Sequence, residues 1–339
     1  MSTRSPTAAE VAARAGVSRM TVYRVMKEDP RVSSSTATSV QRAIRDLNYL
    51  PPGQRNAEAD AAGAGGRHGR LAFLIPDADV AALRTALTGR LLHGIDAVLT
   101  PRSLELSLTR LPAPGQLPGL ITRRKVDGVI VRSSHRDEFP AERIERVPCV
   151  WLMESRRPAP PGDVVHTDDV EIGRLAAEAF CRRGRRHVAI LNENAEHTSY
   201  NERVRGLQVS LSGGPVATEP VDAAGLSGST RQAAACIDRL LDRHPGLDGF
   251  FLPGTVPFVS LLHQALAARG RDLGGVTIVS ASYDADLNAS LRPRPVHIDA
   301  RPEQLGEAAA ELLLWRLSHP AAARRRVTVV PAVIEPEND

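Results

Sequence analysis

Cysteine, aromatic residues and long hydrophobic runs are all scarce in this chain of 339 residues. Its three cysteines, Cys149, Cys181 and Cys236, show no CxxC spacing, which argues against a disulfide framework or a zinc site and favours reduced thiols. No stretch approaches the roughly 18 apolar residues of a membrane span, and the N-terminal residues lack the apolar core of a signal peptide. We therefore expect a cytoplasmic protein that does not contact a membrane.

Positive charge is concentrated near the N-terminus. Residues 1–55 contain nine Arg or Lys and four Asp or Glu, a net charge of +5, whereas the whole chain carries +4. The remaining residues are therefore close to neutral. A basic segment of this kind indicates a surface for phosphate groups, as in nucleic acids.

Residues 7–25, TAAEVAARAGVSRMTVYRV, have the pattern of two short helices joined by a tight turn. Gly16 provides the bend, because a residue without Cβ readily takes positive φ, and Ser18 is placed to cap the second helix. The side chains left on the outer face of that helix are Arg19, Met20, Tyr23 and Arg24. This is the layout of a helix-turn-helix, whose second helix enters the major groove of DNA.

A third helix and a linker follow this pair. Apolar residues at helical spacing predict the third helix before residue 48, and Pro51 ends the segment because proline cannot continue a helix. The next residues are small and polar with clustered glycines, which is the composition of a linker. We expect an all-α DNA-binding domain over residues 1–50, a linker over residues 51–69 and a body over residues 70–339.

From residue 70 onward, short apolar runs alternate with helical stretches. The predicted strands cover residues 70–76, 104–108, 127–131, 149–153, 187–191, 249–253 and 276–282. The predicted helices cover residues 79–99, 170–183, 200–212, 229–243, 256–269 and 302–318. Continuously apolar strands that alternate with helices are typical of α/β proteins with parallel sheets covered on both faces. The run is too long for one ordinary sheet, so we expect two lobes with a ligand cleft at the carboxyl ends of the strands.

The head resembles the LacI/GalR family of bacterial transcriptional regulators in the combination AGVS-x-x-TV-x-RV of residues 15–25. Further matches in the head are Glu10-Val11-Ala12, Val32-Ser33, Ala43-Ile44, Leu47, Tyr49 and Pro51. Matches in the body are VDGVI at residues 126–130, Val147-Pro148, Asp168-Asp169 with Gly173, Arg183-Gly184 with His187, Arg203 with Gly206, and Tyr283-Asp284. The resemblance covers nearly the whole chain.

The resemblance implies a periplasmic-binding-protein-like (type I) body and a homodimer. The N-lobe would comprise residues of about 70–165 and 297–326, and the C-lobe residues of about 166–296 and 327–339. The implied partners are a double-stranded DNA operator with a pseudo-palindromic sequence and a small-molecule effector, such as a sugar or sugar derivative, bound between the lobes. We expect a sequence-specific, nucleoid-associated repressor that needs no cofactor and is not an enzyme. The alternative is a metabolite-binding module or α/β enzyme with a vestigial DNA-binding head.

For the DNA contacts, the resemblance assigns two roles. Positions that match phosphate-contacting hydroxyls are Thr7, Ser18, Thr21 and Ser33. Arg19, Met20 and Arg24 match positions that face base edges, where arginine grips guanine with two hydrogen bonds and methionine offers only apolar contact. Tyr23 replaces the family's usual serine, and its phenol still reaches toward a phosphate. The alternative is that these are solvated side chains of a surface helix.

The linker departs from the family pattern. Family members continue with Tyr-x-Pro-Asn-x-x-Ala-Arg-x-Leu, a hinge helix whose leucine wedges into the minor groove. Here the corresponding positions hold Pro52, Arg55, Asn56 and Glu58, and a carboxylate is repelled by phosphates. We expect this linker to stay mobile or to form a helix without the leucine wedge.

The ligand pocket departs from the family as well. Arg203 is retained, and in the family this arginine bonds hydroxyl or carboxylate groups of the ligand. Asp284 and Asp77 are candidate polar contacts, and Trp151 is a candidate platform for a ring, with a core position as its alternative. Other usual polar positions have changed and only 4% of the residues are aromatic. We therefore do not expect an ordinary hexose bound in the usual way, and loss of effector control is the alternative.

An aspartate pair and three histidines do not indicate a catalytic or metal site. Adjacent Asp168 and Asp169 are interpreted as a helix N-cap followed by a first-turn acid, rather than as an acid–base dyad. His166, His187 and His197 lack metal-ligand spacing, so the sequence predicts no metal site.

Overall fold

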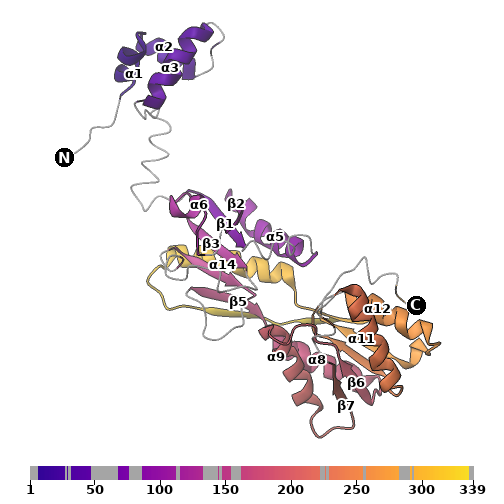
Figure 1. Ribbon diagram of the computed structural model, residues 1–339. Helices are drawn as coiled ribbons and strands as arrows, with labels where there is room; N and C mark the ends of the chain where they lie inside the picture. Colours follow the sequence, from indigo (N-terminus) through magenta and orange to yellow (C-terminus); the bar gives the residue numbers. More distant parts are fainter. Residues whose placement is uncertain are drawn as a thin grey trace. The chain divides into compact units, whose positions relative to one another are not determined.

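The computed structural model describes residues 7–26, 29, 32–46, 68–75, 86–111, 115–132, 144, 147–153, 162–221, 226, 229–254, 257–281, 291 and 294–335. The chain divides into two compact units, Met1–His68 and Gly69–Asp339. We call the first unit the head and the second the body, and describe each by itself (Figure 1).

The described residues of the head form three helices, α1 (Ala8–Ala15), α2 (Arg19–Met26) and α3 (Ser34–Asp46). Thr7 caps α1 through a capping box with Glu10, and Gly16 ends it with a left-handed φ of 67°. Ser18 caps α2, because its Oγ accepts the N–H of Thr21 at 3.1 Å. The predicted helix-turn-helix is therefore confirmed. Its small core is formed by Val11, Ala12, Val22, Val25, Val40 and Ala43.

One sheet of the body is entirely parallel, with strand order β11-β5-β4-β3-β1-β2. Its strands are β1 (Arg70–Ile75), β2 (Glu105–Arg110), β3 (Gly128–Arg132), β4 (Cys149–Leu152), β5 (Asp163–Thr167) and β11 (Arg326–Val329). Among the described residues, the helical elements of this lobe are α5 (Ala86–Leu99), η2 (Thr100–Arg102), α6 (Gly119–Thr122) and α14 (Pro302–Ser318). The buried strands alternate their side chains between two apolar clusters, one of which includes residues of α5 and α14.

The second sheet has the order β12-β10-β9-β8-β6-β7, and only the β10–β12 pair is antiparallel. Its strands are β6 (His187–Ile190), β7 (Ala217–Pro220), β8 (Gly249–Leu252), β9 (Thr277–Ser280), β10 (Val296–Asp299) and β12 (Ala332–Ile334). The helical elements that the structure describes in this lobe are α8 (Asp169–Arg182), α9 (Thr198–Leu211), α11 (Thr230–Arg243), α12 (Pro257–Ala268) and η4 (Leu273–Gly275).

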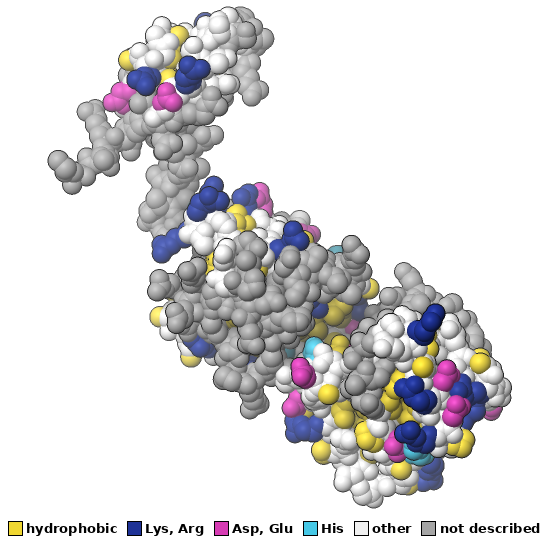
Figure 2. Space-filling view, viewed as in Figure 1, with side chains coloured by type: hydrophobic (Ala, Val, Ile, Leu, Met, Phe, Trp, Pro, Cys, Tyr) yellow, Lys and Arg dark blue, Asp and Glu magenta, His cyan; other side chains and the backbone are white. Residues whose placement is uncertain are grey.

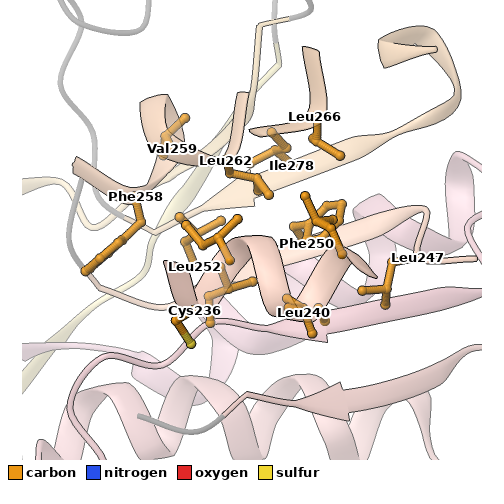
Figure 3. Close-up of a cluster of buried hydrophobic side chains, with 14 of the residues drawn as sticks. Cys236, Leu240, Leu247, Phe250, Leu252, Phe258, Val259, Leu262, Leu266 and Ile278 are labelled. Atoms are coloured by element: carbon orange, nitrogen blue, oxygen red, sulfur yellow. The ribbon is translucent and has the colours of Figure 1, made fainter. Parts of the chain in front are cut away.

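Neighbouring phenylalanines show how the second sheet is covered on both faces. Phe250 packs with Leu240 of α11 and Leu262 of α12 (Figure 3). Phe251, the next residue of the same strand, packs with Ile172 of α8 and Leu207 of α9. Successive side chains of a strand point to opposite faces, so an apolar pair in sequence builds two cores.

The predicted two-lobed α/β body with parallel sheets is confirmed. The chain crosses between the lobes a few residues away from the expected positions. The sequence assigns residue 297 onward to the N-lobe, but β10 pairs with β9 in the C-lobe sheet. It assigns residue 327 onward to the C-lobe, but β11 pairs with β5 in the N-lobe sheet. Both strands alternate polar and apolar residues, as in Val296-His297-Ile298-Asp299, so no continuous apolar run marks them.

The surface of the body is mixed in charge. On the face shown in Figure 2, basic and acidic side chains are interspersed over the part that carries α11 and α12, which fits the near-neutral sum for the body. In the described part of the chain, no helix combines the length and hydrophobicity needed to cross a membrane.

Candidate nucleic-acid interface and ligand site

The outer face of α2 is the first candidate site. Val22 and Val25 are 1% and 8% exposed and hold the helix against the head's core. Met20 and Tyr23 are 60% and 55% exposed, although apolar and aromatic side chains of this size are usually more buried. A helix that buries two valines and exposes such side chains presents a surface suited to a partner.

Two arginines stand on the same face. Arg19 and Arg24 are exposed, and among the described residues neither of them forms an ion pair. The one ion pair described in the head joins Arg14 of α1 to Asp46 of α3 at 3.8 Å. The positive charge on α2 is therefore available to a phosphate or to a base edge.

Hydroxyl side chains mark the beginnings of the three head helices. Thr7, Ser18 and Ser33 precede α1, α2 and α3, and each side chain accepts a backbone N–H of the helix that follows, at 3.3, 3.1 and 3.3 Å. The Ser18 hydroxyl also lies 3.0 Å from the Thr21 hydroxyl. Free N–H groups and the helix dipole make such termini suitable for anions. The four predicted phosphate contacts therefore lie where short hydroxyls and helix N-termini coincide.

A polar cluster at the carboxyl ends of β6 and β8 is the second candidate site, and we call it the carboxyl-end cluster. Its centre is Arg203 of α9, which is 5% exposed. Its Nε donates to Oδ1 of Asp169 at 2.9 Å, and its Nη1 donates to the carbonyl of Pro253, just after β8, at 2.6 Å. Among the described residues, no acceptor bonds its Nη2. This predicted ligand-binding arginine is thus held rigidly by the protein at the strand ends.

Three members of the carboxyl-end cluster are missed by the sequence reasoning. His197 and Tyr200 stack with ring centroids 4.0 Å apart, and the Arg203 guanidinium lies 5.6 Å from the Tyr200 ring. Glu193 is 9% exposed and lies in the loop after β6. Gly254 completes the arrangement, because a Cβ there would come within 2.2 Å of Glu193 and 2.5 Å of the Tyr200 ring. His197 and Tyr200 lie shortly before Arg203 in the sequence, at the start of a predicted helix, and this spacing is the sequence signal that points to these two residues.

The remaining predicted ligand residues do not join this cluster. Trp151 is 1% exposed within β4 and packs with Cys149 and Val164, so the core position applies. It is buried because β4 is a central strand covered on both faces. Asp77 and Asp284 lie outside the described residues, as do residues 51–67 of the predicted linker over residues 51–69.

The interpretation of the aspartate pair is confirmed. Asp168 caps α8 by accepting the N–H of Glu171 at 3.0 Å, and Asp169 is the first residue of the helix. Asp169 has a second function, since it is 6% exposed and neutralises the buried Arg203. A buried carboxylate already paired with arginine is poorly suited to proton transfer.

Known proteins resemble the chain along most of its length. Residues 7–52 match the family described as "Bacterial regulatory proteins, lacI family". The HTH-type transcriptional regulator CelR of Thermobifida fusca is 25% identical over 325 residues, which cover 93% of each chain. The ribose operon repressor of Escherichia coli (strain K12) is 22% identical over 339 residues, 96% of this chain and 97% of that one.

Solved structures share the fold. A transcriptional regulator CelR–cellobiose complex superimposes with a TM-score of 0.62 at 23% identity, covering 98% of this chain and 99% of that one. The lac repressor dimer bound to operator and the anti-inducer ONPF gives a TM-score of 0.62 at 17% identity, with 98% of each chain covered.

The helix-turn-helix head and the two-lobed type I body define a DNA-binding transcriptional regulator. Residues 7–52 match the LacI family of bacterial regulatory proteins and the chain is similar to LacI-family regulators along most of its length, so the resemblance seen in the sequence is confirmed.

Proposed function

We propose that this protein represses transcription from a pseudo-palindromic operator, which it binds as a homodimer, and that a small polar effector at the carboxyl-end cluster controls the binding. The observation that carries the proposal is the outer face of α2, where Arg19 and Arg24, exposed and without an ion pair among the described residues, flank exposed Met20 and Tyr23. Such a protein acts on the chromosome in the cytoplasm and performs no chemistry.

The division of roles on α2 follows from side-chain chemistry. Arg19 and Arg24 select guanine, because a guanidinium donates two parallel hydrogen bonds to its O6 and N7 atoms. Met20 contacts a thymine methyl group, and Tyr23 donates to a phosphate through its phenol. Thr7, Ser18, Thr21 and Ser33 hold the register through phosphates without reading the sequence.

The effector site is the carboxyl-end cluster, complemented by Asp77 and Asp284. Arg203 offers its Nη2 nitrogen, Glu193 offers a carboxylate, and the stacked rings of His197 and Tyr200 offer an apolar face. This combination suits a small hydroxylated or acidic molecule, such as a sugar derivative. CelR is known in complex with cellobiose and other relatives with ribose, which supports a carbohydrate-like ligand here.

Selection from random duplexes tests the DNA part of this proposal. The full-length protein is incubated with a library of double-stranded DNA, and bound duplexes are enriched and sequenced. We expect one motif with two inverted half-sites, because two-fold protein symmetry requires a matching DNA symmetry. Recovery of unrelated duplexes without a shared motif would contradict it and would favour a metabolite-binding protein with a vestigial head.

A ligand screen tests the effector part independently. Sugars, sugar acids, nucleosides and amino acids are added singly, and the melting temperature is recorded, since a ligand that binds the native state raises it. Each ligand that stabilises the wild type is then tested for its effect on operator affinity. We expect at least one ligand that does both, whereas a stabilising ligand without any effect on operator affinity would contradict effector control.

A further inference from the structure

A group of three side chains with atoms that can ligate a metal ion lies outside the DNA interface and the carboxyl-end cluster. His187, Glu219 and His244 each offer one ligand atom, and these three atoms lie within 4.8 Å of one another. All three residues are half-buried. The sequence gives no warning of the group because its members are far apart along the chain, and they meet only through the fold.

The register of two strands places the first two donors on one face. His187 begins β6 and pairs with Ala217 of β7. Glu219 is two residues beyond Ala217, so its side chain points to the same face as that of His187. This is also the face covered by α11, because Ala189 of β6 packs against that helix.

The third donor comes from the end of that helix. His244 is the C-cap residue of α11, and its N–H donates to the carbonyl of Leu240 at 2.9 Å. The three ligands thus belong to β6, β7 and α11, which Figure 1 labels in the lower lobe. Because β6 and β7 are parallel, the group lies toward the amino-terminal side of the sheet, away from the strand ends where Arg203 of α9 bonds Pro253.

The backbone around the first donor is firmly fixed. Asp248 accepts the N–H of His187 at 2.9 Å and that of Arg186 at 2.9–3.0 Å, and its own N–H donates to the His187 carbonyl at 3.1 Å. A fixed backbone at His187 reduces the conformational entropy that metal binding would otherwise cost.

The distances allow a common ion after small side-chain rotations. Nε2 of His244 lies 3.7 Å from Oε1 of Glu219, and the rings of His187 and His244 are perpendicular with centroids 6.1 Å apart. Ligand atoms about 2.0–2.1 Å from a tetrahedral ion are about 3.3 Å apart, so the atoms need to approach by roughly 0.5–1.5 Å.

We propose that His187, Glu219 and His244 bind one divalent transition-metal ion, for which Zn²⁺ is the best match. Two imidazoles and one carboxylate suit Zn²⁺, whereas Mg²⁺ and Ca²⁺ require oxygen ligands. Water completes the coordination on the exposed side. The ion joins β7, the edge strand of the sheet, to the end of α11 and thereby stabilises the C-lobe.

Titration of the full chain with zinc sulfate tests this proposal. The protein carries Cys181→Ser, because Cys181 is a free and exposed thiol that would bind Zn²⁺ by itself. After treatment with a chelator, we expect one Zn²⁺ per chain, a higher melting temperature with excess Zn²⁺, and no response to Mg²⁺. A Co²⁺ titration is expected to give the absorption spectrum of a tetrahedral site.

Variants locate the site. We expect His244→Ala and Glu219→Gln each to weaken Zn²⁺ binding at least tenfold while leaving the metal-free melting temperature nearly unchanged, since both residues are partly exposed. The matched control is His93→Ala, which removes an exposed histidine from α5 and is expected to bind Zn²⁺ as the parent does. Absence of stoichiometric binding to the parent, or equal binding by the parent and by both site variants, would overturn the proposal.

Discussion

Single residues show where chemistry and packing make different demands on the same side chain. Arg203 matches a ligand-binding position, yet two of its nitrogens already bond Asp169 and Pro253. Trp151 has the size and shape of a ring platform, yet it is part of the N-lobe core. Met20 is apolar and 60% exposed, which folding alone does not favour. Among the described residues, Met20 and Tyr23 are the exposed large hydrophobic side chains of the head, and both are residues that we assign to DNA.

We predict that Arg24→Ala relaxes operator specificity at one base pair. The arginine is exposed on α2, so its loss removes a bidentate contact without disturbing the core, and costs roughly 1–3 kcal/mol of operator binding. Binding of the variant to operators altered at each position is measured at one salt concentration. An unchanged ratio of operator to scrambled-DNA affinity would show that Arg24 does not read a base.

We predict that Arg203→Ala destabilises the protein as well as abolishing the effector response. Removal of the guanidinium leaves Asp169 buried and unpaired, which costs roughly 3–5 kcal/mol. The double variant Asp169→Ala/Arg203→Ala is expected to recover part of that loss and still to lack the effector response. Denaturant unfolding of the two single variants and the double variant measures the coupling. Equal destabilisation by Arg203→Ala and the double variant would contradict a coupled pair.

At the scale of helices and strands, each lobe contains a pair of helices that pack with their backbones in direct contact. α8 packs on α9 through Gly173 and Gly206, where an added Cβ would lie 2.0–2.1 Å from backbone oxygen of the other helix. α5 packs on α14 through Gly94 and Gly306, with corresponding distances of 2.0 and 2.2 Å. Each lobe therefore contains one helix pair whose backbones touch, and no side chain other than hydrogen fits there.

We predict opposite effects for two glycine substitutions within α5. Gly94→Ala places a methyl group 2.0 Å from the Glu303 carbonyl and is expected to destabilise the protein by about 1–3 kcal/mol or more. Gly89→Ala meets nothing within 4 Å and is expected to stabilise it by about 0.5–1 kcal/mol, because alanine has the better helix propensity. Thermal unfolding of the two variants measures both effects, and similar melting temperatures would contradict the close packing.

The sequence predicts the strongly patterned elements and misses those that alternate. β1, β3, β4 and β8 are buried on both faces and appear as apolar runs, so their positions are correct to within two residues. β5, β7, β10 and β11 carry polar residues such as Asp163, Glu219 and Arg326, which interrupt the run. Arg203 and the residues of α2 are visible in the sequence through local motifs. His187, Glu219 and His244 are brought together by strand register and a helix end, which the sequence alone does not specify.

At the scale of the whole molecule, regulation requires the lobes to be coupled. An effector changes DNA affinity only as far as it discriminates between lobe arrangements. Arg90 of α5 lies at a crossing between the lobes, where it bonds Asp299 of β10 at 2.9 Å and Glu303 of α14 at 2.5 Å. Arg301, between those two acids, has a left-handed φ of 55°. Charge pairing and a strained backbone position therefore coincide where the chain crosses between the lobes.

We predict that the body loses stability between neutral and mildly acidic pH. Burial lowers the pKa of His263, whose Nε2 has no hydrogen-bond partner among the described residues, and Arg183, Arg185 and Arg294 line the same cavity of about 250 Å³. The unfolded state therefore takes up a proton at a higher pH than the folded state does. This contribution is complete above about pH 6.5 and is lost as the pH falls through the folded pKa.

The melting temperature at pH 7.5 and pH 5.5 measures this effect. The fall between the two values is expected to be smaller for His263→Leu than for the wild type. Glu171 and Glu303, whose pKa values are lowered, respond only at more acidic pH, so they do not obscure the comparison. An identical fall in both proteins would contradict the role of His263.

Operator specificity as a function of salt is the most direct test of the assignment as a sequence-specific DNA-binding protein. The affinity of the full chain for its selected palindrome and for a scrambled duplex of the same length is measured over a range of salt concentrations. We predict a steep loss of both affinities with salt, because each phosphate contact releases counterions, and tighter binding to the palindrome at every concentration. Equal affinity for the palindrome and the scrambled duplex throughout the range would contradict the account.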